Sequence, residues 1–472
     1  MAKYETLIQQ LRQQIQSGVW QVGDRLPSLR EQTQQSQMSL MTVMHAYQVL
    51  ESQGWIISRP RSGYFVAPKV AAPKPQGLHQ SSAVTRAESV DINAFIFEVL
   101  QASRDPGITG FGSAYPDPGL SPHKQLNRAL ISSARTLDSA SALDNLPPGN
   151  PALRHIIAQR YAAQGMSISP DEIVITAGAL EALNLSLQAV TRPGDWVVIE
   201  NPAFYGALQS LERLGLKALA IRTHPQEGID LQSLAQALQT HRVKACWLMT
   251  NFQNPLGCSM SDDKKRRLLK LLQEHDCFLI EDDVYSELYF GKDKPLPAKA
   301  FDPDNRTLHC GSFSKSLVGG FRVGWVAAGK MALSIQKLQL MSTLATSTPV
   351  QLALAHYLST RSYETHLRQL RRTLEQRKFA TWQALKNRLP DNVRVHFGDG
   401  GYFLWVELPE GRDTTELYRQ ALWQGISLAP GQMFSAHREF SHCFRINASL
   451  PGGPKLEQSI TSLAKLIKKA LL

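Results

Sequence analysis

The stretch Gly311-Ser312-Phe313-Ser314-Lys315 places a lysine just past a short apolar run, residues 307–311, that has the pattern of a buried strand. A lysine amid small hydroxyl residues at such a position suits a Schiff base with an aldehyde cofactor. Similar runs precede it, separated by helical patterns, at residues 173–176, 196–200, 246–250 and 277–282. This alternation predicts an α/β domain with a mostly parallel sheet covered on both faces.

The composition is that of a globular protein with more than one domain. The chain has 472 residues, 43% hydrophobic and 19% charged, and this length predicts two or three domains. No apolar stretch approaches the roughly 20 residues that a membrane helix needs, and no signal-peptide pattern opens the chain. Five scattered cysteines without CxxC spacing favour a reducing cytoplasm and argue against a metal site. The net charge of +11 is compatible with a polyanionic partner.

The first 68 residues predict a winged helix-turn-helix. Residues 4–17 carry apolar positions at helical spacing, and a turn at residues 23–28 leads into a second helix, with Pro27 at its first position. Ser39 is placed to cap a third helix, and two β-like runs, residues 55–57 and 64–66, form a hairpin.

The third helix and the hairpin supply candidate DNA contacts. A recognition helix must present short or polar side chains to the major groove, and basic residues on a wing can reach phosphates or the minor groove. Basic and hydroxyl side chains at the second helix can clamp phosphate. The candidates are Arg25, Ser28, Arg30, Ser39, Met41, Thr42, His45, Arg59, Arg61 and Gly63. On the pattern alone, a small helical module for protein interaction remains the alternative.

A stretch rich in proline and alanine, residues 69–89, predicts a linker. Residues 90–472 then form the second domain, with a large part at about 110–340 and a smaller C-terminal α+β lobe at about 341–472. The clearest strand of that lobe is residues 401–406.

Residues at the strand ends meet the demands of pyridoxal 5'-phosphate. Lys315 offers the amine, and Asp282 a carboxylate for the pyridine nitrogen. The remaining candidates are Tyr285 and Asn254 for the ring oxygen, Phe204 for the ring face, and Gly178, Ala179, Leu180, Ser312, Ser314 and Arg322 for the phosphate. Arg445 is the candidate clamp for a substrate carboxylate. Each motif alone has an ordinary structural explanation, such as a surface lysine or a simple turn; their combination favours the cofactor site.

Two family resemblances cover nearly the whole chain. The first 68 residues closely resemble the GntR family of bacterial regulators at Gly23-Asp24-Arg25-Leu26-Pro27-Ser28-Leu29-Arg30, Thr42-Val43, Ala46-Tyr47 and residues 50–54, with Leu40 where the family usually has arginine. From about residue 90 onward the chain resembles fold-type I aminotransferases of the aspartate aminotransferase class. That likeness rests on Asn254-Pro255-x-Gly257, Asp282-x-x-Tyr285, Ser312-x-x-Lys315 with Arg322, and Arg445. Together the two parts resemble the MocR subfamily of transcription regulators.

The resemblance implies pyridoxal 5'-phosphate as cofactor, with Lys315 as its Schiff-base lysine, double-stranded DNA as a partner, and a homodimer of head-to-tail form. Two departures stand out: Leu180 replaces an amide that relatives often carry, and residues 143–149 lack a tyrosine that relatives often supply. Two functions remain open. One is a regulator that senses the cofactor or an amino compound exchanging with Lys315; the other is a working amino-acid aminotransferase with a DNA-binding head.

Overall fold

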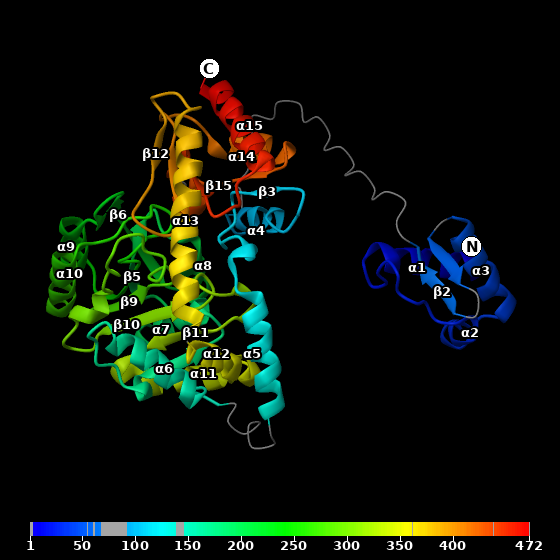
Figure 1. Cartoon of the computed structure of the whole chain (residues 1–472), viewed down its shortest axis with the longest axis horizontal. Coiled ribbons are helices and arrows are strands. Elements are labelled where there is room, and N and C mark those ends of the chain that lie inside the picture. The colour runs from blue at the N-terminus through cyan, green and yellow to red at the C-terminus, as the bar shows by residue number, and fades with distance from the viewer. Residues whose placement is uncertain are drawn as a thin grey trace. The chain divides into compact units, whose positions relative to one another are not determined.

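A computed structural model describes residues 3–53, 55–59, 62–67, 92–137, 146–360, 362–437 and 439–471. The chain divides into two compact units, Met1–Ser89 and Val90–Leu472 (Figure 1). The linker expected at residues 69–89 and the candidate wing residue Arg61 lie outside the described residues.

The first unit is a winged helix-turn-helix, as predicted. Its elements are α1 (Lys3–Gln16), α2 (Leu29–Ser36), α3 (Leu40–Ser52) and the antiparallel hairpin of β1 (Ile56–Arg59) and β2 (Gly63–Val66). Its core is formed by Leu7, Ile8, Leu11, Leu26, Val43, Ala46, Tyr47, Leu50, Ile56 and Val66. The buried Tyr47 hydroxyl donates to the carbonyl of Pro27 at 2.9 Å, which holds the turn before α2 against α3.

The start of α2 differs from the expectation by two residues. Ser28 is the N-cap: its side chain accepts from the amide of Glu31, whose carboxylate accepts from the amide of Ser28. This reciprocal capping satisfies two amides that would otherwise lack partners, so the helix begins at Leu29. Pro27 therefore precedes the cap. Ser39 caps α3 as expected, accepting from the amide of Thr42.

The second unit is built on an eight-stranded sheet in the order β4-β11-β10-β9-β8-β5-β6-β7. Neighbours from β10 through β6 are parallel, while β11 and β7 pair antiparallel with their neighbours. The strands are β4 (Ile173–Thr176), β5 (Trp196–Asn201), β6 (Lys217–His224), β7 (Gly228–Ile229), β8 (Val243–Leu248), β9 (Phe278–Asp282), β10 (Thr307–Ser312) and β11 (Gly324–Ala327). The mostly parallel sheet confirms the predicted α/β class.

Helices surround this sheet (Figure 1), and a smaller lobe follows it. The helices are α4 (Ile92–Ala102), α5 (His123–Thr136), α6 (Pro151–Ala162), α7 (Ala179–Val190), α8 (Tyr205–Arg213), α9 (Leu231–Thr240), α10 (Asp262–Glu274), α11 (Ala332–Ser342) and α12 (Thr348–Leu358). The lobe has an antiparallel sheet in the order β12-β13-β16-β15, with β12 (Arg394–His396), β13 (Phe403–Glu407), β15 (Ala429–Pro430) and β16 (Cys443–Asn447). It also holds α14 (Thr414–Trp423), α15 (Pro454–Leu471) and the short parallel pair of β3 (Thr109–Gly110) with β14 (Ile426–Ser427).

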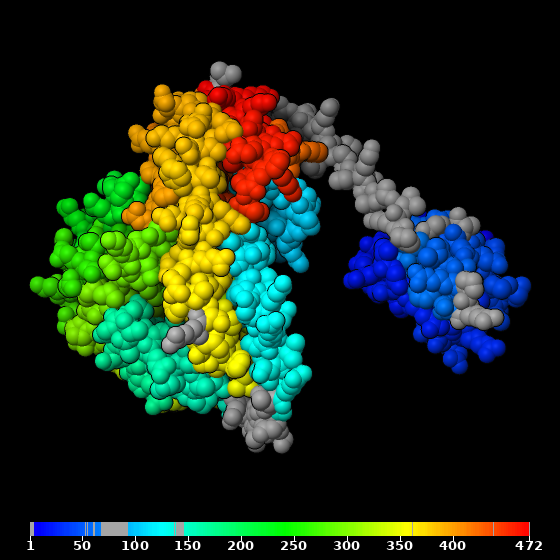
Figure 2. All heavy atoms as spheres, viewed as in Figure 1, coloured from blue at the N-terminus to red at the C-terminus, as the bar shows by residue number. Residues whose placement is uncertain are grey.

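Helix α13 (Ser362–Lys386) belongs to both parts of the second unit. Its N-terminal half buries Tyr363, Leu367 and Leu370 in the core beside the large sheet, and its last turns bury Ala384 and Leu385 in the core of the small lobe. Figure 2 shows its outer side as a yellow band across the surface. Within the described residues, no helix is long and apolar enough to cross a membrane.

The fully buried Leu50 is expected to be essential to the small core of the first unit. Leu50→Ala should lower the free energy of unfolding of this unit by about 2–5 kcal/mol, because deletion of a buried leucine loses apolar contact and leaves a cavity. Hydrogen–deuterium exchange of the α3 amides in the full-length protein measures the change. Gln48→Ala, at an exposed position of the same helix, is the control; equal exchange in the two variants would contradict the expectation.

Candidate functional site

The candidate cofactor residues gather where the strands of the large sheet end. Asp282 is the last residue of β9 and Ser312 the last of β10, while Gly178 lies just after β4. Asn254 follows β8, and Phe204 follows β5. Because these strands run in the same direction, their carboxyl ends meet at one edge of the sheet, where ligands of α/β proteins bind.

A cavity of about 270 Å³ opens at this edge. It is lined by Ala179, Leu180, Phe204, Asn254, Asp282, Tyr285, Ser312, Ser314, Lys315 and Arg322, together with Leu100, Ala114, Tyr115, Leu183, Tyr205, Gly206, Gln209, Met249 and Val284. The cavity thus brings together every cofactor candidate from the sequence except Gly178, which lies against Arg322 at its wall.

Lys315 points into the cavity with few polar contacts. Its Nζ donates to the carbonyl of Ala114 at 2.7 Å and lies 4.0 Å from the centroid of the Tyr115 ring. Burial, and then the nearby Arg445 guanidinium, lowers the pKa of Lys315 to about 7. A sizeable fraction of Lys315 therefore carries a neutral, nucleophilic amine near neutral pH, which an ordinary surface lysine does not.

Asp282 is buried with an oxygen that has no partner. Its side chain is 2% exposed, and Oδ1 forms no hydrogen bond. Burial, and then the charge of Asp283, raises the pKa of Asp282 to about 7. A buried acceptor without a donor is costly. A protonated ring nitrogen placed against Oδ1 would remove that cost, so this carboxylate fits the cofactor assigned to it.

The other end of the cavity suits a phosphate group. Helix α7 begins after Gly178, which has φ +87° and provides no side-chain cap, so the first amides of the helix remain available to an anion. The guanidinium of Arg322 lies so close to Gly178 that a Cβ there would stand 2.5 Å from Nη2. Ser314 Oγ is buried without a partner. Leu180 lines the cavity and is 45% exposed, and it offers no side-chain donor.

The wall residue Phe204 is confined by its neighbours. A Cβ on Gly206 would lie 2.4 Å from the Phe204 ring, so the glycine leaves room for this aromatic side chain. Phe204 lies 4.7 Å from Tyr205, centroid to centroid. An aromatic face fixed in this way suits contact with a flat ring.

Arg445 lies behind the cavity instead of lining it. The side chain is fully buried: Nη1 donates to Asn254 Oδ1 at 2.8 Å, and Nη2 donates to the carbonyls of Gly112 at 3.0 Å and Ser113 at 3.3 Å. Its Nε is buried without a partner. The segment of residues 112–115 therefore occupies donors that a carboxylate clamp would need, a feature that the sequence did not predict.

The DNA-contact candidates of the first unit are largely accessible. Met41 is 69% exposed, and Arg25, Arg30, Ser39, His45 and Arg59 are also exposed, while Thr42, Ser28 and Gly63 are half-buried. The Arg59 guanidinium lies 4.5 Å from the Phe65 ring centroid, and Gly63, with φ +101°, packs beside Arg25. Leu40, in place of the usual arginine, is 49% exposed.

Comparison with known proteins agrees with both halves of this description. The family described as Aminotransferase class I and II matches residues 115–457, and Bacterial regulatory proteins, gntR family, matches residues 3–66. The chain is 61% identical over all 472 residues to a protein described as the uncharacterized HTH-type transcriptional regulator YdcR of Escherichia coli K12, the whole of which it covers. It is 32% identical over 328 residues to aromatic-amino-acid aminotransferase 1 of Thermococcus litoralis, which spans 68% of this chain and 77% of that protein.

The chain belongs to the MocR-type regulators of the GntR family. Its second unit has the fold-type I aminotransferase architecture. Among solved structures it is similar to LysN, the α-aminoadipate aminotransferase of Thermus thermophilus complexed with N-(5'-phosphopyridoxyl)-L-leucine. The TM-score is 0.73 at 27% identity, covering 80% of this chain and 95% of that one.

Two residues near Lys315 in this MocR-type chain were not predicted from the sequence as part of the site. Tyr115 faces Lys315, and the Tyr402 hydroxyl donates at 2.9 Å to the same Ala114 carbonyl that Lys315 contacts. Neither lies in a motif with recognisable spacing; Tyr402 only falls within the strand expected at residues 401–406. Among the described residues, no group of three or more His, Cys, Asp or Glu side chains could hold a metal ion.

The lowered pKa of Lys315 can be tested without any cofactor. Because the amine reacts only when neutral, the rate of acetylation of Lys315 by acetic anhydride should fall about tenfold per pH unit below pH 7 and level off above it. Mass spectrometry of tryptic peptides gives the rate, with the exposed Lys386 as internal reference. A Lys315 rate that kept rising through pH 9 would show that burial does not depress its pKa.

Proposed function

We propose that this protein is a pyridoxal phosphate-dependent, DNA-binding transcription regulator that senses the cofactor, an amino compound, or both. The observation that carries the proposal is the buried pair of Lys315 and Asp282 in one cavity, within a chain whose N-terminal unit is a GntR-type head. Lys315 is a buried amine with a lowered pKa, and Asp282 is a buried carboxylate with an oxygen that has no partner. These are the two groups that the aldehyde and the ring nitrogen of the cofactor require. A regulator that binds bacterial DNA would act in the cytoplasm, and this location is part of the proposal.

The proposal gives each residue of the cavity a role. Lys315 supplies the amine that takes the cofactor, and Asp282 accepts a hydrogen bond from its ring nitrogen. Tyr285 and Asn254 hold the ring oxygen, and Phe204 covers the ring face. The phosphate would be received by the amides of Ala179 and Leu180 with Ser312, Ser314 and Arg322, while the Gly178 amide donates to the carbonyl of Thr176 at 2.8 Å. Bound pyridoxal phosphate supplies an electron-withdrawing ring and an aldehyde that reacts with amines.

The position of Arg445 supports a sensing role. An amino acid whose carboxylate bound Nη2 of Arg445 would compete with the carbonyls of Gly112 and Ser113 for that donor. Binding would therefore displace the segment of residues 112–115, which also receives Lys315 through Ala114. A ligand that binds one position of this segment better than another shifts the equilibrium between them.

We further propose a homodimer, with the head-to-tail arrangement that the family resemblance implies. Exposed apolar side chains support an interface on the second unit: Leu340 and Met341 at the end of α11 and Leu344 just after it are 48%, 76% and 47% exposed. Helix α11 packs on α7, whose Leu180 is also exposed. Exposed apolar side chains gathered near one site are typical of a subunit interface.

A working aminotransferase is the second candidate. Lys315, Asp282, Tyr285, Asn254 and Arg322 line one cavity, with Arg445 directly behind Asn254, so the groups that transamination requires are present. The similarity to aromatic-amino-acid aminotransferase 1 supports this alternative.

One experiment separates the two candidates. The purified protein is mixed with pyridoxal phosphate, then with a panel of amino acids and keto acids, and followed by absorbance, by product analysis and by footprinting on DNA upstream of its own gene. A regulator should give a spectral shift and altered footprint with little turnover. Steady product formation with an unchanged footprint would favour the enzyme.

Lys315→Ala should abolish covalent attachment of pyridoxal phosphate, because no other candidate amine lines the cavity among the described residues. Borohydride reduction followed by mass spectrometry measures attachment. Lys386→Ala, at an exposed lysine, is the matched control and should retain it. A Lys315→Ala protein still modified at the site would show that a different residue carries the cofactor.

The exposed Arg30 is expected to contact a phosphate of the operator. Arg30→Ala should weaken binding about equally for different sequences and reduce the slope of log affinity against log salt concentration by about 1. Fluorescence anisotropy of the full-length protein on an operator fragment measures both quantities. Gln35→Ala, exposed on the same helix, should leave the slope unchanged; a slope unaltered in Arg30→Ala would remove this residue from the interface.

A further inference from the structure

Asp283 lies behind Asp282, on the side of the sheet away from the cavity. Consecutive residues of an extended chain face opposite sides, so Glu281 and Asp283 point away from the cavity that Asp282 lines. All three carboxylates are buried, at 0%, 2% and 4% exposure in chain order. Three acidic side chains in succession away from water need compensating donors.

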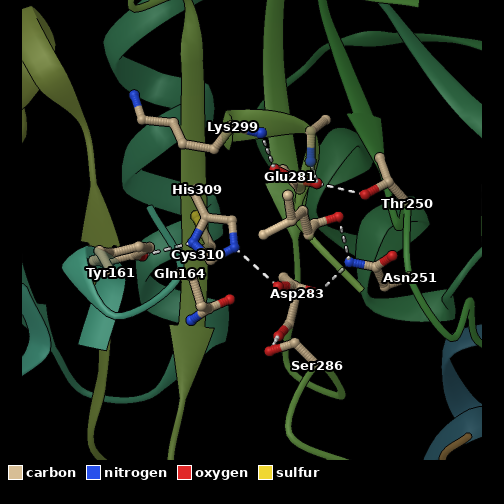
Figure 3. Close-up of polar contacts among 12 residues, drawn as sticks. Tyr161, Gln164, Thr250, Asn251, Glu281, Asp283, Ser286, Lys299, His309 and Cys310 are labelled. Carbon is tan, nitrogen blue, oxygen red and sulfur yellow. Dashed lines mark hydrogen bonds and ion pairs between the residues drawn. The ribbon is translucent and has the colours of Figure 1, made fainter. Parts of the chain in front are cut away.

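A chain of hydrogen bonds ends on Asp283 (Figure 3). Trp325 Nε1 donates to the Tyr161 hydroxyl at 2.9 Å, that hydroxyl lies 2.6 Å from His309 Nδ1, and His309 Nε2 lies 3.0 Å from Asp283 Oδ2. The direction follows from the chemistry, because an indole can only donate. With a neutral imidazole, Tyr161 accepts from Trp325 and gives its own proton to Nδ1, which leaves Nε2 with the proton that faces Asp283.

A second chain reaches the other oxygen of Asp283. Lys265, fully buried, donates from Nζ to Asn251 Oδ1 at 2.7 Å and to the carbonyl of Leu296 at 2.6 Å. Its donation fixes the orientation of the Asn251 amide, whose Nδ2 faces Asp283 Oδ1 at 3.4 Å. Both oxygens of Asp283 therefore receive donors from chains with a defined direction, and this arrangement suits the ionised carboxylate.

Glu281 is compensated separately, so the donors of Asp283 are not shared with it. The Thr250 hydroxyl and the Lys299 amide donate to Glu281 at 2.5 and 2.9 Å (Figure 3). The amide of Ala298 donates to it at 2.6 Å. Asp282, by contrast, keeps a buried oxygen without a partner. Glu281 and Asp283 thus have hydrogen-bond donors on the side away from the cavity, while Asp282, between them in the chain, faces the cavity with an oxygen that has no donor.

We propose that His309 and Tyr161 are positioning residues that act through Asp283: they hold a fixed negative charge behind Asp282, the carboxylate that receives the cofactor's ring nitrogen. The inference rests on the proposed cofactor site. The charge of Asp283 favours a proton on Asp282 or on the ring nitrogen facing it, in line with the raised pKa of Asp282. The hydrogen-bond chain from Trp325 through Tyr161 and His309 to Asp283, called the relay below, therefore stabilises the protonated form of a ring bound at Asp282.

Other charged groups near the relay are paired among themselves. On the same side of the sheet, a small cavity is lined by Tyr161, Asp283 and His309 together with Arg160, Glu287 and Lys294. Arg160 and Lys294 contact Glu287 at 2.8 and 3.0 Å. The titratable groups that face Asp283 are thus His309 from β10, Tyr161 from α6, Lys265 through Asn251, and its neighbours Glu281 and Asp282.

The test compares Asp283→Asn, His309→Leu and His309→Gln with the wild type in full-length protein. The 15N chemical shift of ring-labelled pyridoxal phosphate reports whether the bound ring is protonated. Removal of the charge should lower the pH at which the ring loses its proton by about one unit in Asp283→Asn. His309→Leu should act in the same direction, because a buried carboxylate without its donor takes up a proton. His309→Gln keeps a donor toward Asp283 and should restore most of the wild-type value.

Matched controls separate this effect from a purely structural one. His155→Leu, an exposed position on α6, should titrate like the wild type, and thermal melting identifies any variant that fails to fold. The 13C signal of the Asp282 carboxyl, assigned with Asp282→Asn, gives the same comparison without cofactor: its midpoint should fall in Asp283→Asn. Unchanged midpoints in the Asp283 and His309 variants would overturn the proposal. Failure of the wild type to bind pyridoxal phosphate, with the 13C shift still present, would instead overturn the proposed function alone.

Discussion

The removal of Lys315 and Asp282 from water is the constraint on which the cofactor site depends. In water, one side chain would be a cation and the other an anion; in the cavity, burial moves the pKa of each to about 7. The protein stabilises neither charge fully, because Asp282 Oδ1 has no donor and the Lys315 amine donates to one carbonyl beside two aromatic rings, with the Arg445 guanidinium near enough to oppose its charge. Both groups therefore remain reactive because neither has the full set of solvent or hydrogen-bond partners that would stabilise its charge.

The charges around the cavity explain which ligand can supply the missing contacts. Lys315 and Arg322 line the cavity, and Arg445 lies directly behind it. Among the described residues that line the cavity, Asp282 supplies the carboxylate. Together with the uncapped start of α7, this balance favours a ligand that carries an anionic group at each end and a cation between them. A phosphorylated pyridine joined to an amino acid has that distribution. Behind the sheet, the donors gathered on Asp283 let a second carboxylate lie close to Asp282 without being exposed to water.

The sequence predicted the parts of the site that depend on local order. Strand ends are recognisable from apolar runs, so the sequence alone predicts that Asp282, Lys315 and Asn254 lie at one edge of a parallel sheet. In the large sheet, the strands β6, β7 and β11 were not predicted, because β6 is half-exposed and β7 and β11 have only two and four residues. Tyr115 and His309 meet their partners across long stretches of chain, and no spacing in the sequence marks such contacts. Arg445 was expected to be a clamp, but its burial follows from the segment of residues 112–115, which lies more than 300 residues earlier.

The segment of residues 112–115 connects the candidate cofactor site to the small lobe. Its successive carbonyls receive Arg445 at Gly112 and Ser113 and both Lys315 and Tyr402 at Ala114. It has little freedom to adjust locally, because a Cβ on Gly112 would stand 2.6 Å from the carbonyl oxygen of Leu428. Just before it, β3 pairs with β14 of the small lobe. A ligand that withdrew the amine of Lys315 or the guanidinium of Arg445 would therefore change the hydrogen bonds of a segment that directly follows the strand paired with that lobe.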